Sequence, residues 1–273
     1  MHATLLGTFL SLGAAASALA GTDFHAVSSS LTSSVLHGGD RELTALGFVT
    51  SSSVQNGSNF LHWADGSLTN NIGTYGWTAA MPRDMGSSNS VSGNADRADS
   101  ATPFGGESSS TGTLSEVFGS FGGYKNMSWI IDGEDNGAWT LDLLLGAGQM
   151  LNADADSNTV ELSILERGGN SDLRVRGIRS DGSFTSAIDM LRGATGATGW
   201  TLDTIEIGGS QSVKGVGISL DASWQNLVGF RFEAANGMNG PDLVGVGVTN
   251  ALVPSPGALA LLGAAVLVGR RRR

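Results

Sequence analysis

Residues 139–143 read Trp-Thr-Leu-Asp-Leu, so large apolar side chains alternate with polar ones. Successive side chains of a β-strand point to opposite faces, and this period is therefore typical of a strand with one buried face. The segments 160–164 and 173–176 repeat the pattern. This part of the sequence predicts a sheet with one face on a core and the other in water.

Further strand candidates lie on both sides of this stretch. They share alternating or β-branched apolar residues, and they occupy residues 43–51, 60–63, 201–207, 213–220, 227–233 and 243–248. The pairs Asp181-Gly182, Gly208-Gly209 and Asn236-Gly237 allow the positive φ that tight turns need. Strands about ten residues apart without helical periodicity predict an all-β fold, either an antiparallel β-sandwich or a jelly roll.

The N-terminal half has the weaker strand pattern. Its stretch 86–112 is rich in Ser, Gly, Asn and Asp, which predicts a long loop. We expect one β-sandwich surface domain over residues 21–252. Two smaller domains divided near residue 110 are the alternative.

The charge of the chain is unbalanced. Its 273 residues include 15 Lys and Arg against 25 Asp and Glu, and four of the basic residues form the run 270–273. The remainder therefore carries 11 basic against 25 acidic residues, a net charge of −14. Such a body repels phosphate backbones, so we expect no nucleic-acid partner. The chain contains no Cys, which excludes a thiol nucleophile, a cysteine zinc site and a disulfide framework.

The first segment, residues 1–20, has the pattern of a signal peptide. An apolar run over 5–19 ends in Ala18-Leu19-Ala20 before Gly21. The small residues Ala18 and Ala20 suit a signal peptidase. We expect a signal helix here, its removal, and export of the chain. A buried N-terminal helix is the alternative.

The last segment, residues 253–273, has three parts. Val253-Pro254-Ser255-Pro256 comes first, an apolar stretch follows over 257–269, and Arg270, Arg271, Arg272 and Arg273 come last. The apolar stretch is shorter than the roughly 20 residues of a stable membrane span. The arginines favour the cytoplasmic side of a membrane. We expect a short apolar helix that contacts the membrane, with the protein held transiently or permanently at the envelope or delivered outside the cell.

This tail resembles the PEP-CTERM sorting signal. The resemblance implies export machinery and an exosortase-type membrane enzyme that recognises and processes the tail. Between the two prolines the family usually has Glu, and this chain has Ser255. Over about residues 115–235, the Trp-Thr-Leu at 139–141 and the stretch 165–173 are similar to exosortase-dependent surface proteins, which implies a β-rich surface domain without an assigned activity. A plain C-terminal anchor is the alternative.

Two acidic segments are candidate calcium sites. Residues 132–137 contain three carboxylates and an amide but lack the spacing of an EF-hand. Asp154, Asp156 and Asn158 alternate as at the start of a calcium loop, although no Gly follows at the sixth position. Such oxygen ligands suit Ca²⁺, which is the cofactor that these residues indicate. Solvated turns are the alternative at both segments.

The sequence nominates no catalytic residue. A glycoside hydrolase needs two converging carboxylates, whereas Glu161 and Glu166 are five residues apart on one predicted strand and point to opposite faces. We expect Glu166 to be a buried charge with a structural partner. We also expect Arg167 or Arg174 to pair with a nearby carboxylate.

Three aromatic residues, Trp63, Tyr75 and Trp77, lie in turn-rich sequence. Exposed rings there would stack on sugars, and burial in the core is the alternative. Taken together, these features favour a non-enzymatic exported surface or extracellular-matrix protein with a structural or adhesive role. Extracellular polysaccharide and other surface proteins are the expected partners. A carbohydrate-binding module and, after it, an envelope glycoside hydrolase are the alternative functions.

Overall fold

The computed structural model describes residues 22–27, 32–35, 41–50, 54–57, 63–70, 73–82, 97–102, 111–119, 129–132, 138–190, 192–204, 211–235, 237–248 and 253–254. These residues form antiparallel strands and one short helix, α1 (Leu114–Phe118). The all-β expectation is confirmed for them. The expected signal helix and C-terminal apolar helix lie outside the described residues. No helix within the described part has the length and apolarity that crossing a membrane requires.

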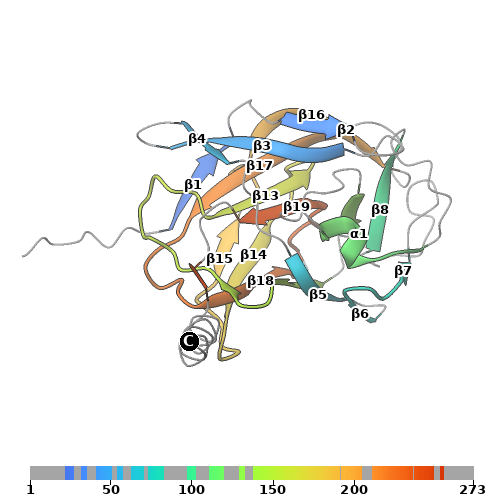
Figure 1. Cartoon of the computed structure of the whole chain (residues 1–273). Coiled ribbons are helices and arrows are strands. Elements are labelled where there is room, and N and C mark those ends of the chain that lie inside the picture. Colours follow the sequence, from blue (N-terminus) through green and yellow to red (C-terminus); the bar gives the residue numbers. More distant parts are fainter. Residues whose placement is uncertain are drawn as a thin grey trace, which may run out of the picture.

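Two large sheets dominate the molecule (Figure 1). The seven-stranded sheet has the order β1 (Asp23–Ala26), β17 (Gln211–Ser219), β13 (Leu162–Arg167), β19 (Leu243–Val248), β10 (Trp129–Asp132), β8 (Arg97–Thr102) and β16 (Gly196–Thr204). The six-stranded sheet has the order β15 (Ile188–Met190), β14 (Leu173–Arg179), β18 (Leu227–Ala234), β11 (Trp139–Leu145), β5 (Trp63–Thr69) and β6 (Thr74–Gly76). Both sheets contain strands from either side of residue 110.

Three smaller sheets complete the described strands. They are β2 (Thr32–Val35) with β3 (Arg41–Val49) and β4 (Val54–Gly57), β7 (Met81–Pro82) with β9 (Thr111–Gly112), and β12 (Gln149–Met150) with β20 (Val253–Pro254). In the last of these, Pro254 pairs with Gln149. Proline is tolerated there because the strand has only one neighbour.

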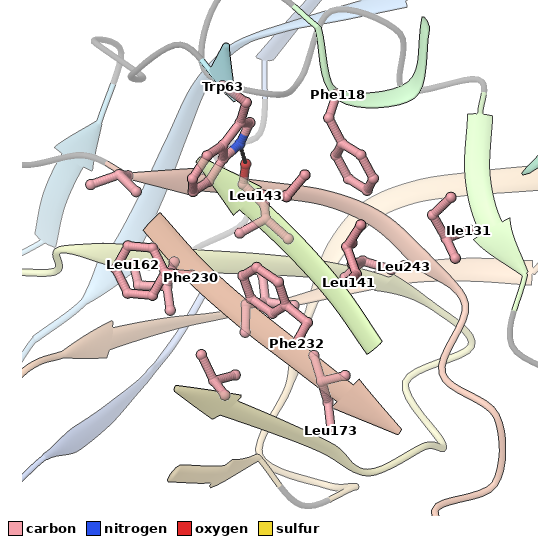
Figure 2. Close-up of a cluster of buried hydrophobic side chains, with 14 of the residues drawn as sticks. Trp63, Phe118, Ile131, Leu141, Leu143, Leu162, Leu173, Phe230, Phe232 and Leu243 are labelled. Carbon is pink, nitrogen blue, oxygen red and sulfur yellow. Dashed lines mark hydrogen bonds between the residues drawn. The ribbon is translucent and has the colours of Figure 1, made fainter. Parts of the chain in front are cut away.

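The main core lies between the two large sheets, which therefore form a sandwich. Figure 2 shows Ile131, Leu162 and Leu243 of the seven-stranded sheet packed with Leu141, Leu143, Phe230 and Phe232 of the six-stranded sheet. The Trp63 indole N–H donates a 2.8 Å hydrogen bond to the carbonyl oxygen of Val246 and so links the sheets (Figure 2). Trp63 is thus a core residue, so of the two roles considered for this ring, burial in the core is the one that the structure shows.

A second core lies on the other face of the seven-stranded sheet, where β3 covers it. Leu46 and Phe48 of β3 pack there with Leu165 of β13. A Cβ atom on Gly217 of β17 would lie 2.6 Å from Cδ1 of Phe48. Glycine is needed at that position because the phenyl ring occupies the space of a side chain.

The predicted strands of the C-terminal half are confirmed where the structure describes them, with shifts of a few residues at their ends, while residues 205–207 of the strand expected over 201–207 lie outside the described residues. The pattern of apolar residues in each strand matches its pattern of burial. Strand β11 buries every second side chain, and β19 buries all six of its residues. The prediction of one long loop over 86–112 is wrong, because β8 (Arg97–Thr102) lies within this stretch and pairs with β10 and β16. Its residues, Arg-Ala-Asp-Ser-Ala-Thr, include no large apolar side chain. Tertiary pairing, not hydrophobic alternation, makes this segment a strand.

Candidate functional site

The six-stranded sheet turns one face away from the main core, and we call this its outer face. On β11, Leu141, Leu143 and Leu145 are buried in the core, while Thr140, Asp142 and Leu144 point the other way and are half-buried. Strand β14 has the same alternation. The outer face is therefore a direct consequence of the period-two pattern.

A row of polar side chains crosses the outer face. The strand register places Ser67, Asp142, Arg231 and Arg176 side by side on β5, β11, β18 and β14. The Arg231 guanidinium donates two hydrogen bonds of 2.7 Å to the two carboxylate oxygens of Asp142. This bidentate contact raises the pKa of Arg231 above its usual value. The pair is fixed and internally neutral.

A second pair of contacts continues the ionic pattern toward the β15 edge. Arg176 Nε donates to Glu233 at 3.1 Å, and Arg174 donates from Nε and Nη2 to Asp189 at 2.6 and 2.9 Å. The hydrogen bond from Arg174 lowers the pKa of Asp189. The expected pairing of Arg174 with a carboxylate is thus confirmed.

The neighbouring row is mostly apolar. It consists of Asp65, Leu144, Gly229, Ile178 and Phe184, which follow one another across the strands. A Cβ on Gly229 would lie 2.3 Å from the Leu143 carbonyl oxygen and 2.8 Å from Cδ2 of Leu144. The row therefore has no side chain at its centre, and the Leu144 side chain leans toward the vacant place.

A hollow of about 350 Å³ opens where these two rows meet. It is lined by Asp65, Gly66, Ser67, Asp142, Leu144 and Ile178. One side is aliphatic, and the other presents two carboxylates and a hydroxyl. This combination of an apolar surface with a few placed polar groups is typical of small-molecule and sugar sites.

Phe184 lies beyond Ile178, at the end of the apolar row that borders the hollow. Phe184 forms an isolated antiparallel β-bridge with Ile178, and the residue is 38% exposed. The Arg231 Cζ atom lies 4.5 Å from the centre of its ring. Such a cation–π contact holds an exposed ring in a defined orientation.

Two carboxyl groups on the seven-stranded sheet are buried and have strongly raised pKa values. Burial raises the pKa of Glu161 to about 8, although the Leu220 N–H opposes the shift. Burial likewise raises the pKa of Glu166 to about 8 against a hydrogen bond from the Gly169 N–H. Glu161 also accepts from the Asp154 N–H at 3.2 Å. Both groups therefore accept hydrogen bonds from backbone N–H groups near the two ends of β13. Glu166 has the expected structural partner, but its raised pKa makes it a protonated carboxyl at neutral pH and not the buried charge that the sequence indicated.

Arg167 is completely buried. Its Nη1 donates to Asp242 at 3.2 Å, whereas its Nε and Nη2 have no hydrogen-bond partner among the described residues. This contact confirms the expected pairing of Arg167 with a carboxylate. The two residues lie beside the left-handed backbone of Gly168 and Gly169, which have φ values of 97° and 67°.

A histidine and a serine meet on the seven-stranded sheet. His25 Nε2 lies 2.8 Å from Oγ of Ser219. The same Oγ lies 2.6 Å from the Thr159 carbonyl oxygen, which can only accept a hydrogen bond. The single hydroxyl proton therefore goes to Thr159, and His25 must donate to Ser219.

The candidate calcium segment 154–158 forms an exposed turn. The Asp156 N–H donates to Asp154 at 2.8 Å, and the Asn158 N–H donates to Asp156 at 2.9 Å. Across the part of the chain that the structure describes, no group of three or more His, Asp or Glu side chains is placed to hold a metal ion. Calcium binding by Asp154, Asp156 and Asn158 stays a prediction.

Several sequence-predicted residues lie outside the described residues. They are Ala18 and Ala20 of the signal segment, residues 133–137 of the first acidic segment, and Ser255, Pro256 and Arg270 to Arg273 of the tail. Val253 and Pro254 are described as β20. Tyr75 and Trp77 are half-buried against the main core.

The residues around the hollow were missed by the sequence reasoning. Asp65, Asp142 and Arg231 come from three strands that only the fold brings together. A usable signal was present at Asp142, which is the charged position in the alternating stretch 139–143.

Comparison with known proteins adds no family to this description. No family model matches the chain, and neither the curated proteins nor the solved structures include a match.

Proposed function

We propose that this chain is a non-enzymatic exported surface or extracellular-matrix protein, sorted by an exosortase-type system, with an adhesive role carried by the outer face of the six-stranded sheet. The observation that carries the adhesive part is the hollow of about 350 Å³ between a fixed ionic row and an apolar row. Its polar groups are suited to holding a ligand. The export part rests on the sequence of residues 1–20 and 253–273.

The arrangement of the carboxyl groups favours binding over hydrolysis. A glycoside hydrolase requires an acid of raised pKa opposite a second carboxylate at the sugar. The carboxyls with strongly raised pKa values, Glu161 and Glu166, belong to the other sheet and are buried. In the hollow, Asp142 is held in its bidentate contact with Arg231.

Sorting can be tested by following the chain in a bacterium that has an exosortase-type enzyme. We expect the full chain in the surface or matrix fraction, with its tail removed. A chain ending at residue 252 lacks the sorting segment and is expected in the medium. Immunoblots of the medium, envelope and cytoplasm distinguish these outcomes.

A substitution control separates sorting from the general effect of truncation. Pro254→Ala with Pro256→Ala keeps the apolar stretch and the arginines and removes the motif alone. We expect this variant to stay in the membrane fraction with an intact tail. The sorting proposal fails when the full chain and both variants have the same distribution.

A further inference from the structure

We infer that the hollow of the outer face binds a neutral polysaccharide, with the sugar ring lying on Leu144, Ile178 and Phe184 and its hydroxyls bonded along the Asp65 to Asp142 side. The inference rests on the proposed adhesive function and names its ligand class. The following contacts and charges carry it.

The hollow is divided into two kinds of surface, one apolar and one polar. A sugar ring has an apolar face of C–H groups and an equator of hydroxyls. Leu144, Ile178 and the exposed ring of Phe184 belong to one register row, in which Gly229 separates Leu144 from Ile178. Ser67 and Asp142 follow in the adjacent row, within the same lining. The two rows match the two surfaces of the ring.

The charges around the hollow favour a neutral ligand. Asp142 is neutralised by Arg231 at 2.7 Å, and Arg176 contacts Glu233 at 3.1 Å. Asp65 is the exposed carboxylate at the β5 end, where its Oδ1 also accepts from the Gly66 N–H at 2.8 Å. A polyanion would meet this carboxylate and the acidic body of the chain, so its binding is disfavoured. Neutral hydroxyls can donate to Asp65 and Asp142 without that cost.

The length of the rows favours a polymer as the ligand. The mostly apolar row, which begins at Asp65 on β5, runs across β11 and β18 to β14, which is three strand spacings of about 4.8 Å, or about 14 Å in all. At the β6 edge, Gly76 stands beside Ser67, and nothing lies within 4 Å of the place of its missing Cβ. The mostly apolar row is therefore long enough for more than one sugar unit, and the adjacent row of Ser67 and Asp142 is open at its β6 end. A polymer fits this shape better than a single sugar.

The test is affinity electrophoresis and titration calorimetry of the full chain, purified from whichever cell fraction contains it. Failure of sorting and failure of binding are then separate results. The probes are the neutral polymers laminarin, dextran and galactomannan, with polygalacturonate as the anionic polymer and chitosan as the cationic one. We expect binding to at least one neutral polymer and none to polygalacturonate.

Three variants connect that binding to the hollow. Asp65→Ala removes an exposed acceptor and should weaken binding about tenfold. Ser67→Arg fills the hollow and should abolish it. Asp189→Ala, the matched control, removes one carboxylate from the far edge of the same sheet and should leave the affinity within about twofold, since surface charges there are screened from the hollow. Thermal melts show whether each variant is folded. If Ser67→Arg does not fold, Asp65→Ala still tests the site.

Binding to polygalacturonate or chitosan alone would overturn the assignment of a neutral ligand. Absence of binding to all three neutral polymers would overturn the site itself. Equal losses in Asp65→Ala and Asp189→Ala would show that the effect is one of charge on the whole sheet, which also overturns it.

Discussion

Replacing Asp242 with alanine removes the carboxylate that contacts the buried guanidinium of Arg167. The Arg167 side chain has no exposed surface, and that of Asp242 is 13% exposed. Within the part of the chain that the structure describes, Arg167 Nε and Nη2 have no hydrogen-bond partner, so the contact of Nη1 with Asp242 at 3.2 Å compensates the charge of this guanidinium. In the variant, a charged group stays buried without a counter-ion.

Breaking a buried pair by removing one partner costs about 3–5 kcal/mol. For a domain of this size, 1 kcal/mol corresponds to roughly 2–4 °C in Tm. We therefore expect Asp242→Ala to lower Tm by about 6–20 °C. The double variant Arg167→Met with Asp242→Asn should recover most of this loss, because a buried ion pair replaced by uncharged groups is often nearly neutral.

The chain offers a closely matched control. Arg176 and Glu233 also make a single contact, at 3.1 Å, but their side chains are 31% and 27% exposed. Solvent screens that pair, so Glu233→Ala should cost about 0–1 kcal/mol. Calorimetric melts of the three variants at one pH give the comparison. The reasoning is refuted if Asp242→Ala costs no more than Glu233→Ala, or if the double variant is as unstable as Asp242→Ala.

Three other predictions concern stability. The pKa values of Glu161 and Glu166 are raised to about 8 from 4.5, so the folded chain holds protons that the unfolded chain releases between these pH values. Their contribution to the free energy of unfolding is fully present below about pH 4.5 and is lost as pH rises through about 8. Glu161→Gln or Glu166→Gln should flatten this decline in stability, by up to about 1.4 kcal/mol per pH unit for each group. Urea titrations at pH 5, 6.5 and 8 measure the change. Gly217→Val places a side chain against Phe48, so we expect a loss of about 1–3 kcal/mol in the same titrations, and an unchanged midpoint would contradict the packing of β3 on β17. The calcium hypothesis predicts that millimolar Ca²⁺ raises Tm relative to EGTA, by about 2.7 kcal/mol at a hundredfold excess over Kd, and that Asp154→Ala abolishes the rise; identical melts in Ca²⁺ and EGTA would remove the loop as a metal site.

The strands with strong alternation could be predicted from the sequence alone. The segment 139–143 became the N-terminal part of β11, and 243–248 became β19 with the same bounds. A strand with one buried face needs an apolar residue at every second position, and a strand with two buried faces needs apolar or small residues throughout. The partial success at Arg167 and Arg174 has a similar origin, because charges next to buried positions require counter-ions.

Other features depended on contacts between distant segments. Strand β8 has no hydrophobic pattern and is a strand because β10 and β16 supply its hydrogen bonds. Trp63 lies in turn-rich sequence, yet it is buried because its indole reaches the Val246 carbonyl in the other sheet. Neither outcome has a local cause in the residues on either side.

By itself, therefore, the sequence determined the fold class, the position of the strands with strong alternation or apolar content, and the sign of the body's charge, since each of these depends on composition or on a period of two residues. Only the tertiary structure decided the site. Asp65, Asp142 and Arg231 are separated by up to 166 positions in the numbering, and strand register places them on one face. Register is set by pairing between strands, and so the hollow arises only when β5, β11, β18 and β14 lie side by side.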